Sequence, residues 1–315
     1  MMRMKQSAEQ IFTKPWVVGL LATFSCFLWG SAFPCVTIGY ELFSVDGSIP
    51  SLLLYAGLRF ALAGVLAIAF GSVGQRRLLY PQKAKNYWYV VALALFQTIG
   101  QYIFYYIGLY HTAGVKASII NGAGVFLSIL IACFLFRQEK FNLVKLLGCL
   151  LGLAGVVIVN FDADLELSFA WNGEGFLLIS TVLSGVAASL SKIYAKYEHP
   201  VTLSGWQFLF GGVVLSAVGL VFGGSVRPTG AGAFFLLIYL ALISSVAFSL
   251  TGILMKYNPV SVVQSYKSLT PVFGVILSAL FLHEEELLSL ETLFSLALVV
   301  LSIFVINRYG EKKKS

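Results

Sequence analysis

Charge is scarce in this sequence. Only 11% of its 315 residues are Asp, Glu, Lys or Arg, whereas a typical soluble domain contains about 25%. In contrast, 58% of the residues are hydrophobic. The composition excludes an ordinary soluble domain and predicts an integral membrane protein.

Cysteine and histidine are also rare, and their positions show no recognisable site. The chain has Cys26, Cys35, Cys133 and Cys149, with His111, His199 and His283. The cysteines lie in apolar runs without CxxC spacing, which argues against a disulfide framework. The histidines lack metal-ligand spacing and no nucleophile–base pair is visible, so we expect no metal, no cofactor and no enzyme.

Long apolar runs dominate the sequence. A bilayer core of about 30 Å needs roughly 20 apolar residues per helix. The runs lie at 16–38, 50–71, 87–108, 113–136, 142–160, 174–194, 203–223, 232–255, 260–282 and 288–307. Continuous stretches such as 127–136 do not alternate as barrel strands do, so we predict an all-α protein with ten transmembrane helices. No small-residue cleavage site follows the first run, which we expect to be retained.

Basic residues are unevenly placed along the chain. Seventeen of the 21 Lys and Arg residues lie before the first helix, after the last one, or in alternate loops between them. By the positive-inside rule these loops and both termini are cytoplasmic. Acidic residues such as Glu41 and Asp46 occupy the opposite loops. The net charge of +7 therefore describes one membrane face, and we expect no nucleic-acid partner.

The two halves of the chain resemble each other at a fixed offset. At 147 residues, the matches are Tyr110 with Tyr257, Asn121 with Ser268, 124–126 with 271–273, and Glu139 with Glu286. At 148 residues, Arg59-Phe60 lies over Gln207-Phe208. Because each half has five predicted helices, an odd number, the second half should be inverted in the membrane. Inverted repeats of this kind are typical of secondary transporters.

This repeat predicts the domain organisation. We expect a cytoplasmic tail at 1–15, a first five-helix repeat at 16–160, an acidic extracytoplasmic linker at 161–173, a second repeat at 174–307, and a basic cytoplasmic tail at 308–315.

Lys267 is the most informative polar residue. It lies about eight residues, or 12 Å, from the cytoplasmic end of its predicted helix, where a charge is costly and functional by default. Gln264, Ser268 and Pro271 share its stripe, with Tyr266 and Thr270 beside it. A lone lysine that snorkels to the headgroups does not require such a stripe, although snorkelling stays an alternative.

Other polar residues in the predicted helices are candidates for the same site. Gln97, Gln101 and Tyr105 are four residues apart and should share a helix face, which either lines a solute pathway or holds helices together. The candidate substrate-binding residues are Trp29, Gln97, Gln101, Tyr105, Asn121, Ser245, Tyr266, Lys267 and Thr270. Arg59 is a further intramembrane charge, which either snorkels, pairs with Glu41 or Asp46, or has a functional role.

Several of these segments resemble a known family. Trp29-Gly30-Ser31, Pro271-Val272-Phe273 followed by Glu, the spacing from Glu139 to Gly148, and the five-plus-five layout are similar to the EamA family of the drug/metabolite transporter superfamily. The resemblance covers residues 16–307. It implies a bacterial inner-membrane exporter or exchanger of small metabolites, often amino acids, with the first, third, fourth, sixth, eighth and ninth helices around a central cavity.

The sequence departs from this family in two places. Gly124 stands where the family commonly has Pro, which puts a matching kink in the first half in doubt. The first helix lacks a carboxylate, so the proton-coupling Glu of the small multidrug relatives has no equivalent.

The predicted function is secondary transport by alternating access, in the direction of export. Lys267 near a helix N-terminus favours a small organic anion or zwitterion such as an amino acid. The alternatives are a carrier of neutral or cationic compounds with Lys267 structural and, more distantly, a membrane scaffold or enzyme. The expected partners are a small solute and the bilayer. Whether a proton or a counter-substrate is also transported, and whether the protein is a monomer or a homodimer, stays open.

Overall fold

The computed structural model describes residues 8–112, 114–159, 169–282 and 290–310. Every regular element in these ranges is a helix, as the uninterrupted apolar runs predict. Six helices are long and apolar enough to cross a membrane. They are α2 (Pro15–Leu42), α3 (Ile49–Gln75), the continuous helix Ala84–Tyr110, the continuous helix Trp171–Tyr194, α9 (Pro200–Val221) and α10 (Ala231–Tyr257).

Two of these long helices contain π-helical turns. Ala84–Tyr110 consists of α4 (Ala84–Leu93), the π-helix η1 (Ala94–Gly100) and α5 (Gln101–Tyr110). Trp171–Tyr194 consists of the π-helix η3 (Trp171–Gly175) and α8 (Phe176–Tyr194).

The remaining helices are shorter or interrupted. They are α6 (Gly114–Leu130) with the π-helix η2 (Ile131–Leu135), α7 (Leu143–Val159), α11 (Val260–Ser265), the 3₁₀-helix η4 (Tyr266–Ser268), α12 (Leu269–Leu282) and α13 (Leu290–Tyr309). Each of the ten predicted ranges overlaps helical residues in the described part of the chain. That all ten cross the membrane stays a prediction.

The 3₁₀ turn between α11 and α12 has a local cause. Pro271 has no backbone N–H, and its ring clashes with the carbonyl four residues earlier, which belongs to Lys267. The backbone at Tyr266–Ser268 therefore tightens instead of continuing as an α-helix. In the first half Gly124 replaces this proline, and α6 runs unbroken through it.

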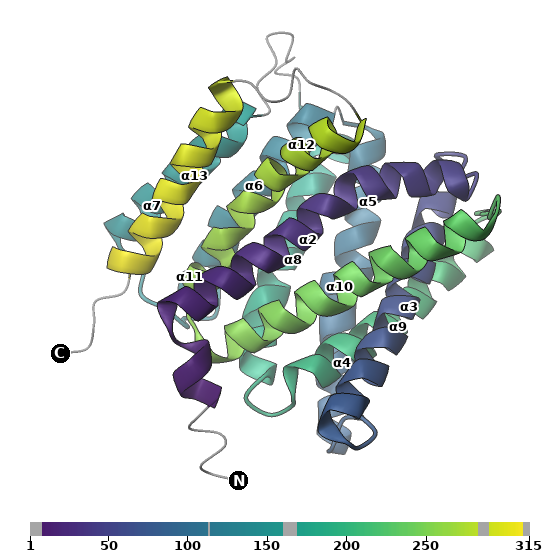
Figure 1. The fold of residues 1–315 in the computed structure, drawn as a ribbon, viewed down its shortest axis with the longest axis horizontal. Coiled ribbons are helices and arrows are strands. Elements are labelled where there is room, and N and C mark those ends of the chain that lie inside the picture. The colour runs from purple at the N-terminus through teal and green to yellow at the C-terminus, as the bar shows by residue number, and fades with distance from the viewer. Residues whose placement is uncertain (1–7, 113, 160–168, 283–289, 311–315) are drawn as a thin grey trace.

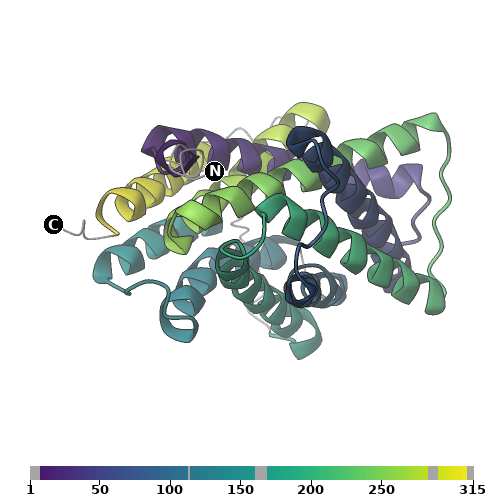
Figure 2. The same cartoon turned by 90° about the horizontal axis from the view of Figure 1, so that it is seen from below.

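The helices pack as a broad bundle (Figure 1). α2 and α10 lie side by side across it, α7 packs along α13 at one edge, and α3 packs along α9 toward the other. Seen from below, α2 and α13 lie on one broad side and α7 and α8 on the other (Figure 2).

α3 and α9 approach so closely that their backbones touch at glycines. A Cβ atom on Gly64 would lie 2.7 Å from the carbonyl oxygen of Gly205, and one on Gly212 would lie 2.7 Å from that of Gly57. The two contacts are equivalent in the repeat, because at an offset of 148 Gly57 corresponds to Gly205 and Gly64 corresponds to Gly212. Because the higher number on one helix meets the lower on the other, α3 and α9 are antiparallel.

α7 and α13 repeat this relation. Ser302 Oγ donates to the carbonyl of Gly148 at 2.6 Å, and Ser295 Oγ donates to that of Gly155 at 2.7 Å. At an offset of 147, Gly148 corresponds to Ser295 and Gly155 corresponds to Ser302, so the two hydrogen bonds occupy equivalent positions of the repeat. The two helices are again antiparallel, so equivalent helices of the two halves face each other in opposite directions.

The two ends of the bundle carry different loops. One end, here called the Glu139 face, brings together loop 136–142, residues 256–261 and the described ends of the chain. Three hydrogen bonds join these segments: Ser261 N to Glu139 Oε1 (3.1 Å), Asn142 Nδ2 to Gly310 O (2.9 Å) and Asn258 Nδ2 to Phe12 O (2.8 Å). The other end, the Asp46 face, joins loop 43–48 to loop 222–230, where Arg227 N donates to Phe43 O at 2.7 Å.

Candidate functional site

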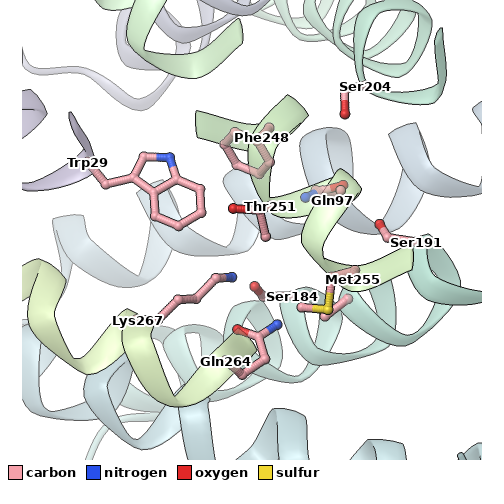
Figure 3. Close-up of a pocket in the computed structure, with 12 residues that line it drawn as sticks. Trp29, Gln97, Ser184, Ser191, Ser204, Phe248, Thr251, Met255, Gln264 and Lys267 are labelled. Atoms are coloured by element: carbon pink, nitrogen blue, oxygen red, sulfur yellow. The ribbon is translucent and has the colours of Figure 1, made fainter. Parts of the chain in front are cut away.

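A small polar cavity lies between the two halves. It is lined by Trp29, Gln97, Ser184, Ala188, Ser191, Ser204, Phe248, Thr251, Gly252, Met255, Gln264 and Lys267 (Figure 3). These residues come from α2, η1, α8, α9, α10 and the α11–η4 segment. Of the helices that the family resemblance places around a cavity, α6 contributes no lining residue among those described.

The cavity is small in this conformation. Its volume is about 30 Å³, which is room for about two water molecules at the usual minimum of 10–15 Å³ each. Sites that hold a metabolite are commonly at least about 300 Å³. A solute can therefore bind here only when the lining helices move apart.

Lys267 is the charged residue of this cavity. It lies in η4, at the break between α11 and α12, and its Nζ is 5.3 Å from the centroid of the Trp29 ring. No hydrogen bond or ion pair joins Nζ to any residue that the structure describes. A cation–π contact contributes only about 0.5–2 kcal/mol, so the ammonium keeps its donors available for an acceptor.

Gln264 presents a second set of unused polar atoms. It lies one turn before Lys267, is 1% exposed, and neither its Oε1 nor its Nε2 has a hydrogen-bond partner. Its side chain points toward the same space as Lys267 and Ser184 (Figure 3). A buried polar group left unpaired costs about 1–3 kcal/mol, so this amide fits a solute that supplies both a donor and an acceptor.

Aromatic rings form the opposite wall. The edge of Phe248 meets Trp29 with a centroid distance of 5.1 Å. α2 holds Trp29 there because Gly30 lies against α12, where a Cβ would come within 3.0 Å of the backbone nitrogen of Gly274. Trp29 thus both packs against neighbouring helices and lines the cavity.

Three of the nine predicted site residues line this cavity: Trp29, Gln97 and Lys267. Gln97 lies in the π-helix η1, whereas Gln101 and Tyr105 lie in α5 and do not line the cavity. That the three share one helix face stays a prediction. The carbonyl of Gln101 accepts from Ser180 Oγ at 2.9 Å, and Tyr105 packs on Tyr106.

The other predicted residues lie elsewhere. Asn121 is exposed, Ser245 is buried within α10, and Tyr266 packs against the core cluster that contains Val18. Thr270 is partly buried near the start of α12. None of the four lines the cavity described above, and their part in binding stays a prediction.

Several residues that line the cavity were not among the predicted site residues. Gln264 could have been found from the sequence, since it lies three residues before Lys267 on the same stripe. The sequence also contains a pattern that groups Phe248, Thr251 and Met255, because spacings of three and four place them on one face of α10. No pattern singles out the serines of α8 and α9, because small polar residues are common throughout membrane helices.

Arg59 has a different partner from those expected. Its Nε and Nη2 donate to Ser244 Oγ at 3.2 and 3.0 Å. The ion pair with Glu41 or Asp46, one of the alternatives for Arg59, is not formed among the described residues, and Asp46 accepts from Ser48.

Apolar helices around a polar internal site define a multi-pass membrane protein of the kind that carries solutes. The chain belongs to the EamA-like transporter family, whose model matches residues 16–161 and again residues 171–308. The two matches confirm the family resemblance and show a tandem repeat.

Named relatives agree with this class. The chain is 27% identical to a WAT1-related chloroplastic protein of Arabidopsis thaliana, over 89% of this chain and 67% of that protein. It is 26% identical to an uncharacterized transporter of Synechocystis sp. (93% of this chain and 90% of that protein) and 26% identical to the uncharacterized transporter YvbV of Bacillus subtilis (94% and 93%). A solved crystal structure with 20% identity shares the fold, with a TM-score of 0.78 over 96% of this chain and 100% of that one. The protein is a membrane transporter.

Proposed function

We propose that the protein is a secondary transporter of a small organic anion or zwitterion, such as an amino acid. The observation that carries this proposal is Lys267, a charged side chain at a helix break that has no counter-charge among the described residues. Interrupted helices near the membrane midplane form the solute sites of many secondary transporters.

A carboxylate is the solute group that suits this cavity best. It would accept hydrogen bonds from the Lys267 ammonium and supply the missing negative charge. Gln264 and Thr251 would orient the rest of the solute, and the rings of Trp29 and Phe248 would contact its apolar part.

The proposed mechanism is alternating access between two inverted repeats, 16–160 and 174–307, joined by the linker 161–173 and flanked by the tails 1–15 and 308–315. The antiparallel contacts of α3 with α9 and of α7 with α13 support the inversion, because a two-fold axis in the membrane plane turns each helix over. Since the cavity is too small to hold a metabolite in this conformation, rocking of one half against the other would widen it toward each side in turn.

The proposed location is a bacterial inner membrane, with both termini cytoplasmic and export as the direction of transport. The concentration of Lys and Arg on the loops of the Glu139 face supports this orientation. A proton or a counter-substrate would drive the flux.

The test uses purified protein in proteoliposomes. The probes are L-phenylalanine, 3-phenylpropanoate, which lacks the amine, and 2-phenylethylamine, which lacks the carboxylate. Lys267→Met should lower the flux of both carboxylates at least about tenfold, because a hydrogen bond to a charged group contributes about 1.5–3 kcal/mol. Lys267→Arg should retain part of the carboxylate flux, because it keeps the positive charge.

Lys140→Met is the matched control, since it removes the same charge from an exposed loop position. Full carboxylate flux in Lys267→Met would remove Lys267 from the site. Wild-type protein that moves only the amine would favour the carrier of neutral or cationic compounds, with Lys267 held structurally by Trp29.

A further inference from the structure

A second cation lies in the membrane on the opposite side of the cavity from Lys267. Arg59 is on α3, which begins at the Asp46 face, whereas Lys267 follows α11, which begins at the Glu139 face. No carboxylate among the described residues forms an ion pair with Arg59. Its hydrogen bonds go to one neutral hydroxyl, that of Ser244, although a guanidinium has five N–H donors.

The surroundings of Arg59 are rich in hydroxyl groups. The rings of Tyr40 and Tyr55 are 5.5 Å apart, Tyr102 packs on Phe60 at 4.5 Å, and Tyr106 lies 6.1 Å from Tyr102. Tyr55 lies four residues before Arg59 on the same face of α3, is 1% exposed, and its hydroxyl has no hydrogen-bond partner. A carboxylate could accept from the Tyr55 hydroxyl and from the guanidinium together.

Ser244 is an acceptor that a stronger one can displace. Its own hydroxyl proton is donated to the carbonyl of Leu240 at 3.1 Å, so only its lone pairs serve Arg59. A carboxylate oxygen forms shorter and stronger hydrogen bonds with a guanidinium than a neutral hydroxyl does.

A continuous row of aromatic rings connects Arg59 with the cavity. The steps are Lys267 Nζ to Trp29 (5.3 Å), Trp29 to Phe248 (5.1 Å), Phe248 to Phe208 (4.7 Å), Phe208 to Phe60 (5.3 Å) and Phe60 to the Arg59 guanidinium (5.4 Å). On α10, Ser244, Phe248 and Thr251 follow at helical spacing, so one face of this helix runs from Arg59 to the cavity.

We propose that Arg59 and the Tyr55 hydroxyl form a second carboxylate-binding station, between the cavity and the Asp46 face. The inference rests on the proposed function and extends it. The solute carboxylate is held by Lys267 on the Glu139 side and by Arg59 on the Asp46 side, and Ser244 occupies the guanidinium when the station is empty.

The experiment measures the apparent KM for 3-phenylpropanoate separately at each face, in membrane vesicles of opposite orientation. Arg59→Gln should raise the KM at the Asp46 face at least tenfold and leave the KM at the Glu139 face within twofold. Arg59→Lys should restore part of the affinity. Ser244→Ala should leave the KM at the Asp46 face unchanged or lower it, because the competing hydroxyl is gone.

A purely structural Arg59 gives a different pattern. Arg59→Gln would then lower Vmax or raise both KM values equally, and Ser244→Ala would impair transport in the same way. Either of these two results would contradict the proposed second carboxylate-binding station. If the Arg59 variants do not elute as folded protein in size-exclusion chromatography, Tyr55→Phe decides, because loss of one hydroxyl should raise the KM at the Asp46 face only.

The outcome for Arg59 is separable from that for Lys267. Loss of carboxylate flux in Lys267→Met together with unchanged kinetics in Arg59→Gln refutes the second station and keeps the proposed function. Wild-type protein that moves 2-phenylethylamine but not the carboxylates, or none of the probes, refutes both.

Discussion

At the scale of single residues, two lysines show what distinguishes a structural charge from a candidate site. Lys145 is 1% exposed and pairs with Glu139 at 2.8 Å. Lys267 lies inside the bundle, with no such partner among the described residues. A buried charge with its counter-ion is satisfied, whereas one without it is costly. This difference is why Lys267, and not Lys145, is the candidate to bind a solute.

Glu139 joins the two halves of the protein at one face. Besides the ammonium of Lys145, its carboxylate accepts from the backbone N–H and the hydroxyl of Ser261 in the first turn of α11. Burial raises the pKa of Glu139, but the hydrogen bonds from Lys145 and Ser261 outweigh it and hold the pKa below its ordinary value. The carboxylate therefore stabilises the folded protein in its charged form.

Glu139→Gln should lower the free energy of unfolding by about 3–5 kcal/mol, because it leaves Lys145 buried without a counter-charge. Thermal unfolding in detergent measures this, with the exposed Glu9→Gln as the control. The double variant Glu139→Gln/Lys145→Met should lose less than the sum of the single variants.

The same pair predicts a pH dependence. Since the folded pKa of Glu139 lies below the unfolded one, its contribution is complete above about pH 4.5 and is lost as the pH falls further. Wild-type stability should decline in that range more steeply than that of Glu139→Gln. Parallel pH profiles would contradict this account of Glu139.

At the scale of elements, close packing of α3 on α9 is the most specific feature. Phe60 stacks on Phe208 at 5.3 Å, with the rings 8° from parallel. On either side of this pair the backbones meet at glycines, so even one added methyl group must displace main-chain atoms. The sequence had shown these two helices only as matching segments, and the structure makes them direct partners.

Gly64→Ala and Gly212→Ala should destabilise the protein by similar amounts, about 1–3 kcal/mol each, because the two positions make equivalent backbone contacts. Thermal unfolding of the purified variants measures the loss. Gly232→Ala is the matched control, since a Cβ there meets nothing within 4 Å. Loss of stability in only one of the two variants would argue against equivalent contacts.

At the scale of the whole molecule, the two faces differ in charge and in what they join. The Glu139 face gathers the loops rich in Lys and Arg together with the described ends of the chain, whereas the Asp46 face holds the connections after α2 and α9. This arrangement agrees with the predicted topology, in which an even number of crossings brings both termini to the cytoplasmic side.

Reporter fusions in a bacterial host test that topology. A green fluorescent protein at either terminus should fluoresce, and alkaline phosphatase at either terminus should be inactive, because each reporter works on only one side of the inner membrane. Phosphatase inserted in the loop after Thr229, at the Asp46 face, should be active. The reverse pattern would place Lys and Arg outside and contradict the positive-inside prediction.

The sequence by itself determined the features that depend on local composition. Hydrophobic runs predicted the positions of the helices, charge placement predicted the faces, and the fixed offset between the halves predicted a repeat that the two family matches show. Pro271 and Gly124 also predicted the difference between α11–α12 and α6, because a missing N–H acts within four residues of chain.

Only the tertiary structure decided which polar side chains meet. Gln97 lines the cavity together with Lys267 whereas Gln101 does not, and the packing of α10 gave Arg59 the hydroxyl of Ser244 in place of a carboxylate. These contacts join segments more than a hundred residues apart. They depend on how each helix is rotated and how closely it packs, and no local pattern of residues encodes that geometry.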